Sequence, residues 1–162
     1  MDRKLGTFRR LFAVLLLAVW WGGFTFYALV VVPTGHSVLR SKVRQGFITQ
    51  EVTNKLNILG AETLVLLLWQ CVATRREIGS PAWFRTAAIS WAVLAATLAL
   101  LCWLHPRLDA LLDAEHRSVL DDDKFYALHR IYLVIATGQW LAGGVHLASL
   151  VRGPRGHNGR RN

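Results

Sequence analysis

Long runs of hydrophobic residues alternate with short charged stretches along this 162-residue chain. The four runs cover about residues 11–32, 56–73, 82–104 and 128–151. A helix needs about 20 mainly apolar residues to cross the hydrocarbon core of a bilayer, and each run is close to that length. The pattern therefore predicts an all-α, four-helix transmembrane bundle over residues 1–152, followed by a basic, disordered tail over 153–162.

The flanks of the first run indicate a retained signal anchor. Four basic residues precede it, namely Arg3, Lys4, Arg9 and Arg10. The run is longer than the hydrophobic region of a cleaved signal peptide, and Trp20 and Trp21 stand where cleavage needs small residues. Pro33 is expected to end this first helix.

The second and third runs carry signs of helices that meet the membrane interface. Apolar residues recur at helical spacing before the second run, at Phe47, Val52, Leu56 and Leu59. An interfacial helix over 45–57 is therefore expected to lead into it. In the third run, Trp83 and Trp103 lie near the two ends, where interfacial aromatic residues are favoured. His105 and Pro106 are expected to end that helix.

Composition and charge narrow the function classes. The chain is 53% hydrophobic and 18% charged, with a net charge of +9, which excludes a disordered chain and leaves no room for a large soluble catalytic domain. The basic residues flank the apolar runs, so they indicate topology rather than nucleic-acid binding. They are more numerous in the segments that would be cytoplasmic with the N-terminus inside, which predicts a multi-pass plasma or inner membrane protein with both termini cytoplasmic.

Motifs for catalysis and for structural cross-links are missing from the sequence. Cys71 is expected near the inner face and Cys102 near the outer face, too far apart for a disulfide, which needs Cα atoms within about 7 Å. No P-loop, nucleotide-binding fingerprint, G-x-S-x-G, H-E-x-x-H or paired-carboxylate pattern occurs. We therefore expect no enzymatic activity and no cofactor.

Glu62 is the acidic residue that lies well inside an apolar run. An ionised group at mid-depth costs about 2.5–3.5 kcal/mol or more, so it needs a partner, a proton or a wet cavity. One interpretation is a cation or proton site. The preferred interpretation is a structural pair with His129, Arg130 or Lys55, which are expected at a similar depth.

A stripe of polar residues follows the fourth run. Tyr132, Gln139 and His146 recur every seven residues, with Ala136 and Gly143 between them, so they share one helical face. Polar groups alternating with small residues suit a helix–helix contact, which is the preferred interpretation. The same stripe would also suit one wall of a narrow polar pathway.

The histidines raise the question of a metal or haem. His36, His105 and His129 are expected near the outer ends of their helices, with Glu62 just below them. Two or three imidazoles at one depth can hold copper, zinc or a haem iron. The spacing matches no specific metal motif, and internal methionine is absent from the sequence. We therefore predict no metal and keep these three histidines as a less favoured alternative.

Small residues predict close helix contacts. They occur in pairs or at four-residue spacing, at Gly22 and Gly23, at Gly143 and Gly144, at Ala92 and Ala96, and at Ala95 and Ala99. Such patterns let helix backbones approach one another in a membrane. They would also serve a homo-oligomer or a hetero-oligomer.

Two short motifs carry a family resemblance. Residues 21–33 read WGGFTFYALVVVP and residues 125–131 read FYALHRI. In these motifs the chain resembles a four-span membrane family, the domain of unknown function numbered 4149, whose animal members are called transmembrane protein 205. A weaker likeness, through the Gly-Gly-x-x-Phe region, links it to the copper-resistance D-type membrane domain. The main resemblance implies a four-helix integral membrane protein of undefined activity.

The leading functional hypothesis is a non-enzymatic membrane protein associated with transport or envelope stress. Its candidate polar site comprises Glu62, His105, His129, Tyr132, Gln139 and His146. The lipid bilayer is the expected partner, and nucleic acid is not. Two alternatives stay open, a haem- or metal-binding membrane protein and a membrane scaffold subunit of a larger complex.

Overall fold

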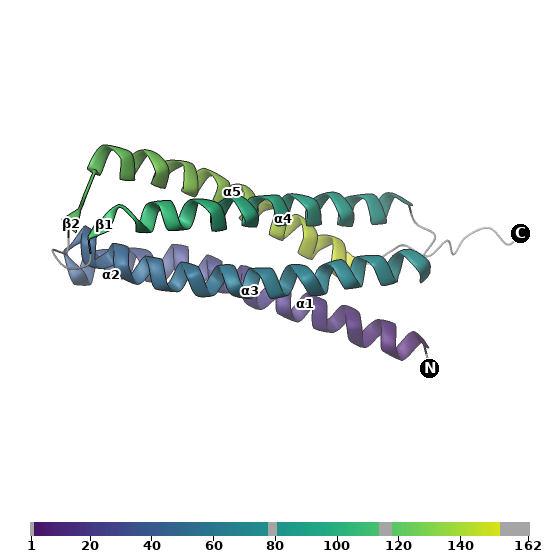
Figure 1. The fold of residues 1–162 in the computed structure, drawn as a ribbon. Helices are drawn as coiled ribbons and strands as arrows, with labels where there is room; N and C mark the ends of the chain where they lie inside the picture. Colours follow the sequence, from purple (N-terminus) through teal and green to yellow (C-terminus); the bar gives the residue numbers. More distant parts are fainter. Residues whose placement is uncertain (1, 78–80, 114–117, 153–162) are drawn as a thin grey trace, which may run out of the picture.

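Four long helices run beside one another in the computed structural model, which describes residues 2–77, 81–113 and 118–152 (Figure 1). The elements in chain order are α1 (Asp2–Phe26), the π-helical turn η1 (Tyr27–Val31), α2 (Val32–Leu39), α3 (Lys42–Glu77), α4 (Pro81–Asp109), β1 (Leu112–Asp113), β2 (Ser118–Val119) and α5 (Asp122–Arg152). The expected basic tail over 153–162 lies outside the described residues. The all-α bundle is confirmed.

The first helix does not end at Pro33, contrary to the sequence-based expectation. η1 and α2 continue from α1, and the N–H of Val32 bonds the carbonyl oxygen of Tyr27, five residues back. Pro33 has no N–H to donate, and the wider π-helical turn directly before it accommodates the missing bond. The helix ends instead at Arg40, which takes a left-handed conformation with a φ of 49°.

The helices of the second and third runs are also longer than the apolar runs. α3 is one continuous helix of 36 residues that includes the expected interfacial segment. At about 1.5 Å per residue it exceeds the roughly 30 Å hydrocarbon core. α4 continues past Pro106 to Asp109, and a side-chain contact between His105 and Asp109 braces this last turn. The expected helix end at His105 and Pro106 is therefore wrong.

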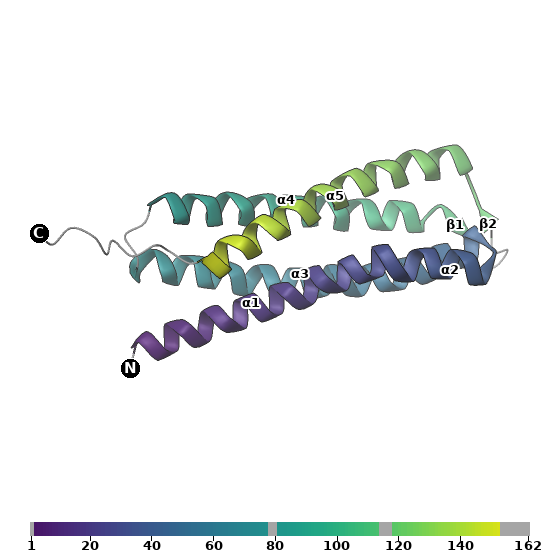
Figure 2. The same cartoon turned by 180° about the vertical axis from the view of Figure 1, so that it is seen from behind.

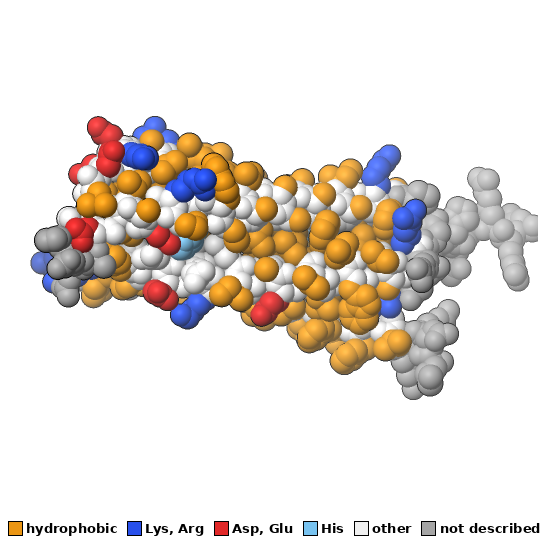
Figure 3. Space-filling model, viewed as in Figure 1, with side chains coloured by type: hydrophobic (Ala, Val, Ile, Leu, Met, Phe, Trp, Pro, Cys, Tyr) orange, Lys and Arg blue, Asp and Glu red, His pale blue; other side chains and the backbone are white. Residues whose placement is uncertain are grey.

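All four long helical segments are apolar and long enough to cross a membrane. Figure 3 shows hydrophobic side chains along the length of one face, with Lys and Arg at both ends of the bundle. Such an apolar surface is stable against lipid and unstable against water, and basic side chains favour the headgroup region on either side. The protein is a multi-pass membrane protein.

The two ends of the bundle differ. The start of α1 and the end of α5 lie together, because the guanidinium of Arg10 donates to the carbonyl oxygens of Leu150 and Val151 at 2.8 and 2.7 Å. A cation at this position offsets the unpaired carbonyls of a helix C-terminus. We call this the terminal end. The opposite, hairpin end carries β1 and β2, which pair antiparallel (Figure 1).

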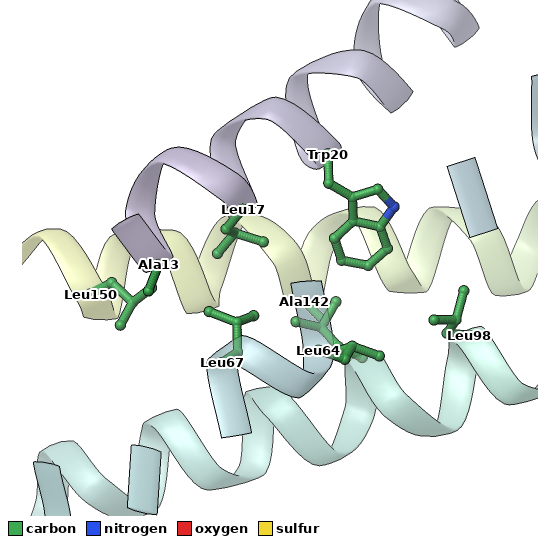
Figure 4. Packing of buried hydrophobic residues seen from close by; sticks show 9 residues of the cluster. Ala13, Leu17, Trp20, Leu64, Leu67, Leu98, Ala142 and Leu150 are labelled. Carbon is green, nitrogen blue, oxygen red and sulfur yellow. The ribbon is translucent and has the colours of Figure 1, made fainter. Parts of the chain in front are cut away.

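The buried core lies between the four helices. Figure 4 shows side chains from every long helix meeting there: Ala13, Leu17 and Trp20 from α1, Leu64 and Leu67 from α3, Leu98 from α4, and Ala142 and Leu150 from α5. Both Leu17 and Leu67 are almost completely buried. In lipid such contacts act through close van der Waals packing, since the surroundings are themselves apolar.

Tryptophan side chains tie the helices together. Five indole N–H groups donate across helices: Trp20 to Leu56 O (3.0 Å), Trp21 to Trp140 O (2.9 Å), Trp83 to Ser149 O (2.9 Å), Trp91 to Leu64 O (2.9 Å) and Trp140 to Thr25 Oγ1 (2.8 Å). An indole N–H buried in an apolar medium needs an acceptor. These bonds therefore fix the register of neighbouring helices.

Two of these tryptophans rest on glycines. A Cβ at Gly60 would lie 2.7 Å from Cζ2 of Trp20, and a Cβ at Gly143 would lie 2.6 Å from Cδ1 of Trp21. Only glycine leaves room for rings this close to a neighbouring backbone. Gly22, by contrast, faces open space. Oligomer formation through the Gly and Ala faces stays a prediction.

α5 packs along α4 and meets α1 in the middle of the bundle. There the rings of Trp21 and Trp140 stack with centroids 5.2 Å apart. Towards the hairpin end α5 diverges from η1 and α2, as Figure 1 and Figure 2 show from opposite sides. This divergence positions the cavity described next.

Candidate functional site

A cavity of about 430 Å³ lies at the hairpin end, bounded by the end of α1, η1, α2, α3, the end of α4, β1, β2 and the first half of α5. Most of its lining is apolar, including Phe24, Val32, Leu56, Leu108, Phe125 and Leu133. Small-molecule sites in proteins usually measure about 300–1,000 Å³ and have mostly apolar walls with a few polar groups. The cavity matches that description.

Three polar side chains of the cavity wall are buried without hydrogen-bond partners among the described residues. They are the hydroxyl of Tyr27, both amide atoms of Gln45 and the amide nitrogen of Gln139. The three side chains are 8%, 8% and 5% exposed, respectively. A buried polar group left unpaired costs about 1–3 kcal/mol. Each of these groups would therefore be stabilised by a bound molecule that supplied its missing hydrogen-bond partner.

Local structure explains how two of these groups reach the cavity. Tyr27 opens the π-helical turn, and such turns recur at functional sites because they change the direction of the side chains. Its hydroxyl lies beside the Thr49 and Thr53 side chains of α3. Gln45 fits against Gly35, where a Cβ would collide with the amide oxygen of Gln45.

The seven-residue stripe of α5 divides between two environments. Tyr132 and Gln139 line the cavity, and the Tyr132 hydroxyl lies near the Asn57 side chain. His129 also lines the cavity and stacks on Phe125, with ring centroids 5.8 Å apart. This part of the stripe forms a wall of a mostly apolar cavity, which is neither the helix–helix contact nor the narrow polar pathway considered from the sequence.

His146, the last member of the stripe, makes a helix–helix contact instead. Its Nδ1 lies 2.7 Å from Oγ of Ser90 on α4, and its side chain is 1% exposed. Ser90 also donates towards the carbonyl oxygens of Thr86 and Ala87 on its own helix. The preferred interpretation of the stripe therefore holds at this end, and His146 does not belong to the cavity.

His105 lies in a wall shared by two hollows. Its Nδ1 is 2.7 Å from Oδ2 of Asp109, and its Nε2 is 3.2 Å from the carbonyl oxygen of Gln50. The second hollow measures about 350 Å³, and its lining includes Asn54 and Asn57. The contacts of His105 hold the ends of α3 and α4 together between the two hollows.

The proposed pair between Glu62 and a basic residue is not formed. Glu62 is exposed on α3 and makes no ion pair or hydrogen bond with any described residue. Lys55 contacts Glu51 instead, at 3.5 Å. His129 lies in the cavity wall, and Arg130 is exposed on α5. The preferred interpretation of Glu62 as one half of a structural pair was therefore wrong.

Helical phase explains where Glu62 points. Thr63 and Leu67, one turn apart, are both buried in the core. A residue one position before Thr63 is rotated by about 100° around the helix axis. Glu62 therefore shares its side of α3 with Val65 and Trp69, which are exposed. It lies away from the cavity and from the histidines expected beside it.

The three outer histidines line the same cavity. His36 is exposed on α2, His105 is bonded to Asp109, and His129 stacks on Phe125. Within the described ranges, no group of three His, Cys, Asp or Glu side chains could hold a metal ion. The sequence placed these histidines at one end of the bundle, and the structure places all three in the wall of one cavity.

Basic residue Arg9 is buried at the terminal end of the bundle. Its Nε donates to Oε1 of Gln70 at 2.7 Å, and Nε2 of Gln70 donates to Oγ1 of Thr74 at 3.0 Å. This polar network of Arg9, Gln70 and Thr74 joins α1 to α3 far from the cavity, so we assign it a structural role.

The two cysteines form no disulfide. Cys71 is buried as a free thiol, and Cys102 is free and exposed.

Sequence reasoning missed Tyr27 and Gln45. Tyr27 stands inside a continuous apolar run, where an aromatic residue is typical of a membrane helix. The signal that could have found it is Pro33, six residues later, because a proline disturbs the hydrogen bonds of the preceding turn. Gln45 was hidden in the polar start of the amphipathic segment before the second run.

Comparison with known proteins adds one match. The model of a family described as "Domain of unknown function (DUF4149)" matches residues 15–117. The matched segment contains Tyr27, Gln45 and His105, while Tyr132 and Gln139 of the cavity wall lie after it. No curated protein and no solved structure matches the chain.

Proposed function

The chain belongs to the DUF4149 family of unknown function, and we propose for it a non-enzymatic, transport-associated role in binding a hydrophobic small molecule. The observation that carries this proposal is the cavity of about 430 Å³ with mostly apolar walls. A molecule that fills such a space inside a membrane bundle replaces poorly packed lipid with well-packed protein contacts.

The surroundings of the cavity favour loading from the bilayer. On its rim, Ala28 of η1 and Leu133 of α5 are exposed on helices that can cross a membrane. Towards the hairpin end the lining includes Leu112 and Val119 from β1 and β2. Apolar residues at that end disfavour access of water, so a hydrophobic molecule would reach the cavity through the side between η1 and α5.

The charge distribution supports a position on the outer side of a plasma or inner membrane. If both termini are cytoplasmic, as the basic flanks predict, the hairpin end and the cavity face the outer leaflet. Hydrophobic compounds that arrive from outside partition first into that leaflet. A binding site there suits a protein that assists transport or responds to stress on the envelope.

Binding of a fluorescent hydrophobic probe tests this proposal. The purified full-length protein in detergent would be titrated with N-phenyl-1-naphthylamine, whose emission rises in an apolar site. We expect saturable binding, weakened about tenfold or more by Ala28→Trp, which narrows the rim. The matched control is Ala96→Trp, because Ala96 is exposed on α4 and does not line the cavity. Absence of saturable binding, or equal loss in both variants, would overturn the proposal.

A further inference from the structure

We infer that the ligand of the cavity is an uncharged lipid whose polar end carries hydrogen-bonding oxygen atoms, such as a glycerol ester or a quinone. This inference rests on the proposed function and names its ligand class. Three observations on the cavity wall carry it, namely its charge, its unpaired polar groups and the level at which those groups lie.

The described cavity lining offers little to a charged headgroup. It contains no lysine or arginine, so a phosphate or carboxylate would be buried without a strong cationic partner. Its one carboxylate, Asp109, is already bonded to His105 at 2.7 Å, so an ammonium group would have to displace that contact. Anionic and cationic lipids are both disfavoured for the same reason, because a buried charge needs a partner.

The unpaired groups make a pure hydrocarbon equally unsuitable. Tyr27, Gln45 and Gln139 come from η1, α3 and α5, are each more than nine-tenths buried, and line the same cavity. Tyr27 and the amide nitrogen of Gln139 can donate hydrogen bonds, and Gln45 can donate and accept. A carbonyl or hydroxyl oxygen would satisfy these groups, whereas an alkane would leave them unpaired.

The register of the helices places Tyr27 and Gln139 at a similar depth along the bundle axis. Trp140 on α5 donates to Thr25 on α1 at 2.8 Å, which places these two residues side by side. The helices run in opposite directions, so Tyr27 and Gln139 both lie within about 3 Å of that level towards the hairpin end, at about 1.5 Å per residue. The two residues therefore lie at a similar depth in the bundle, which is the depth at which we place the polar head, with its tail against the apolar walls.

The first test compares headgroups on one chain length. Native mass spectrometry of the full-length protein in a non-ionic detergent would measure binding of 1-oleoylglycerol, oleate, oleylamine and 1-octadecene. We expect 1-oleoylglycerol to bind about tenfold more tightly than each of the other three. Binding of decylbenzoquinone would be measured in the same way. If decylbenzoquinone binds more tightly than 1-oleoylglycerol, the preferred polar end is a quinone ring. If it binds more weakly, the preferred polar end is a glycerol ester.

The second test removes the polar contacts. Tyr27→Phe and Gln139→Leu should each weaken binding of the preferred uncharged lipid about threefold to tenfold, the effect of one hydrogen bond, and leave binding of 1-octadecene unchanged. Thr137→Val is the matched control, because Thr137 is exposed and bonds its own helix at Leu133. Both cavity variants should keep or raise the melting temperature, since each removes an unpaired buried group.

The outcomes separate this inference from the proposed function. If 1-octadecene or oleate binds as tightly as the uncharged oxygenated lipids, or if the two variants change nothing, the inference is overturned while hydrophobic binding stands. If neither N-phenyl-1-naphthylamine nor any of these lipids binds, the proposed function itself fails.

Discussion

The indole nitrogen of Trp140 donates a hydrogen bond to Oγ1 of Thr25 at 2.8 Å, and Thr25 in turn donates to the carbonyl oxygen of Trp21 at 2.7 Å. Trp21 completes the connection by donating to the carbonyl oxygen of Trp140 at 2.9 Å. This closed set of bonds joins α1 to α5 below the cavity. Because it fixes both the register and the rotation of the two helices, it also determines which residues face the cavity.

The Trp140–Thr25 bond should contribute measurably to stability. We expect Thr25→Val to lower stability by about 1–3 kcal/mol, because it leaves a buried indole N–H without an acceptor. Trp140→Phe in the Thr25→Val background should cost less than the two single changes added together. Thermal unfolding in detergent with all four combinations measures the coupling. Strictly additive effects would show that the bond contributes nothing.

Gly143 should not tolerate alanine. A Cβ there would lie 2.6 Å from Trp21, so the ring would have to move and the contacts between α1 and α5 would weaken. We expect Gly143→Ala to lower stability by about 1–3 kcal/mol, in the range of overpacked cores. Gly138→Ala on the same helix has nothing within 4 Å of its Cβ and should stabilise by about 0.5–1 kcal/mol. Melting temperatures that move in the same direction would contradict this assignment.

Removal of the Ser90 hydroxyl should lower the stability of the protein and leave ligand binding unchanged. Ser90→Ala leaves Nδ1 of the buried His146 unpaired, so we expect a loss of about 1–3 kcal/mol in thermal unfolding. Binding of N-phenyl-1-naphthylamine to the folded protein should be unchanged, because neither residue lines the cavity. Thr86→Ala is the control, since Thr86 is exposed and bonds only its own helix. A selective loss of binding in Ser90→Ala would place His146 in the functional site.

Neutralising Glu62 should not destabilise the protein. Glu62 has no ion pair or hydrogen bond in the part of the chain that the structure describes, so Glu62→Gln should leave the melting temperature unchanged or raise it. Asp109→Asn provides the contrast, because Asp109 is bonded to His105 and its change should lower the melting temperature. A clear fall with Glu62→Gln would mean that a partner holds the carboxylate in the membrane.

Local sequence signals located the helices well and their ends poorly. The apolar runs predicted the four membrane-spanning helices, because each such helix must be apolar along its length whatever its neighbours are. Pro33 and Pro106 indicated helix ends, yet both lie within helical segments. The energetic cost of a proline inside a helix depends on whether the backbone can compensate for the lost hydrogen bond. The π-helical turn at Tyr27 is one such compensation. That arrangement cannot be deduced from the order of residues alone.

The candidate site was likewise predictable from the sequence in part. The stripe of Tyr132, Gln139 and His146 was visible because seven residues return to one helical face. Whether a member faces a cavity, as Gln139 does, or a neighbouring helix, as His146 does, depends on how α5 diverges from η1 and α2 and stays against α4 (Figure 2). Glu62 was misplaced because its depth could be predicted and its rotation could not.

By itself the sequence determined a four-helix membrane protein, because hydrophobicity and backbone hydrogen bonding are satisfied within each segment. Only the tertiary structure decided that Tyr27, Gln45 and Gln139 share one cavity and that Glu62 is outside it. The physical reason lies in the rotation and register of the helices. These are set by contacts between distant residues, above all the tryptophans seated on Gly60 and Gly143.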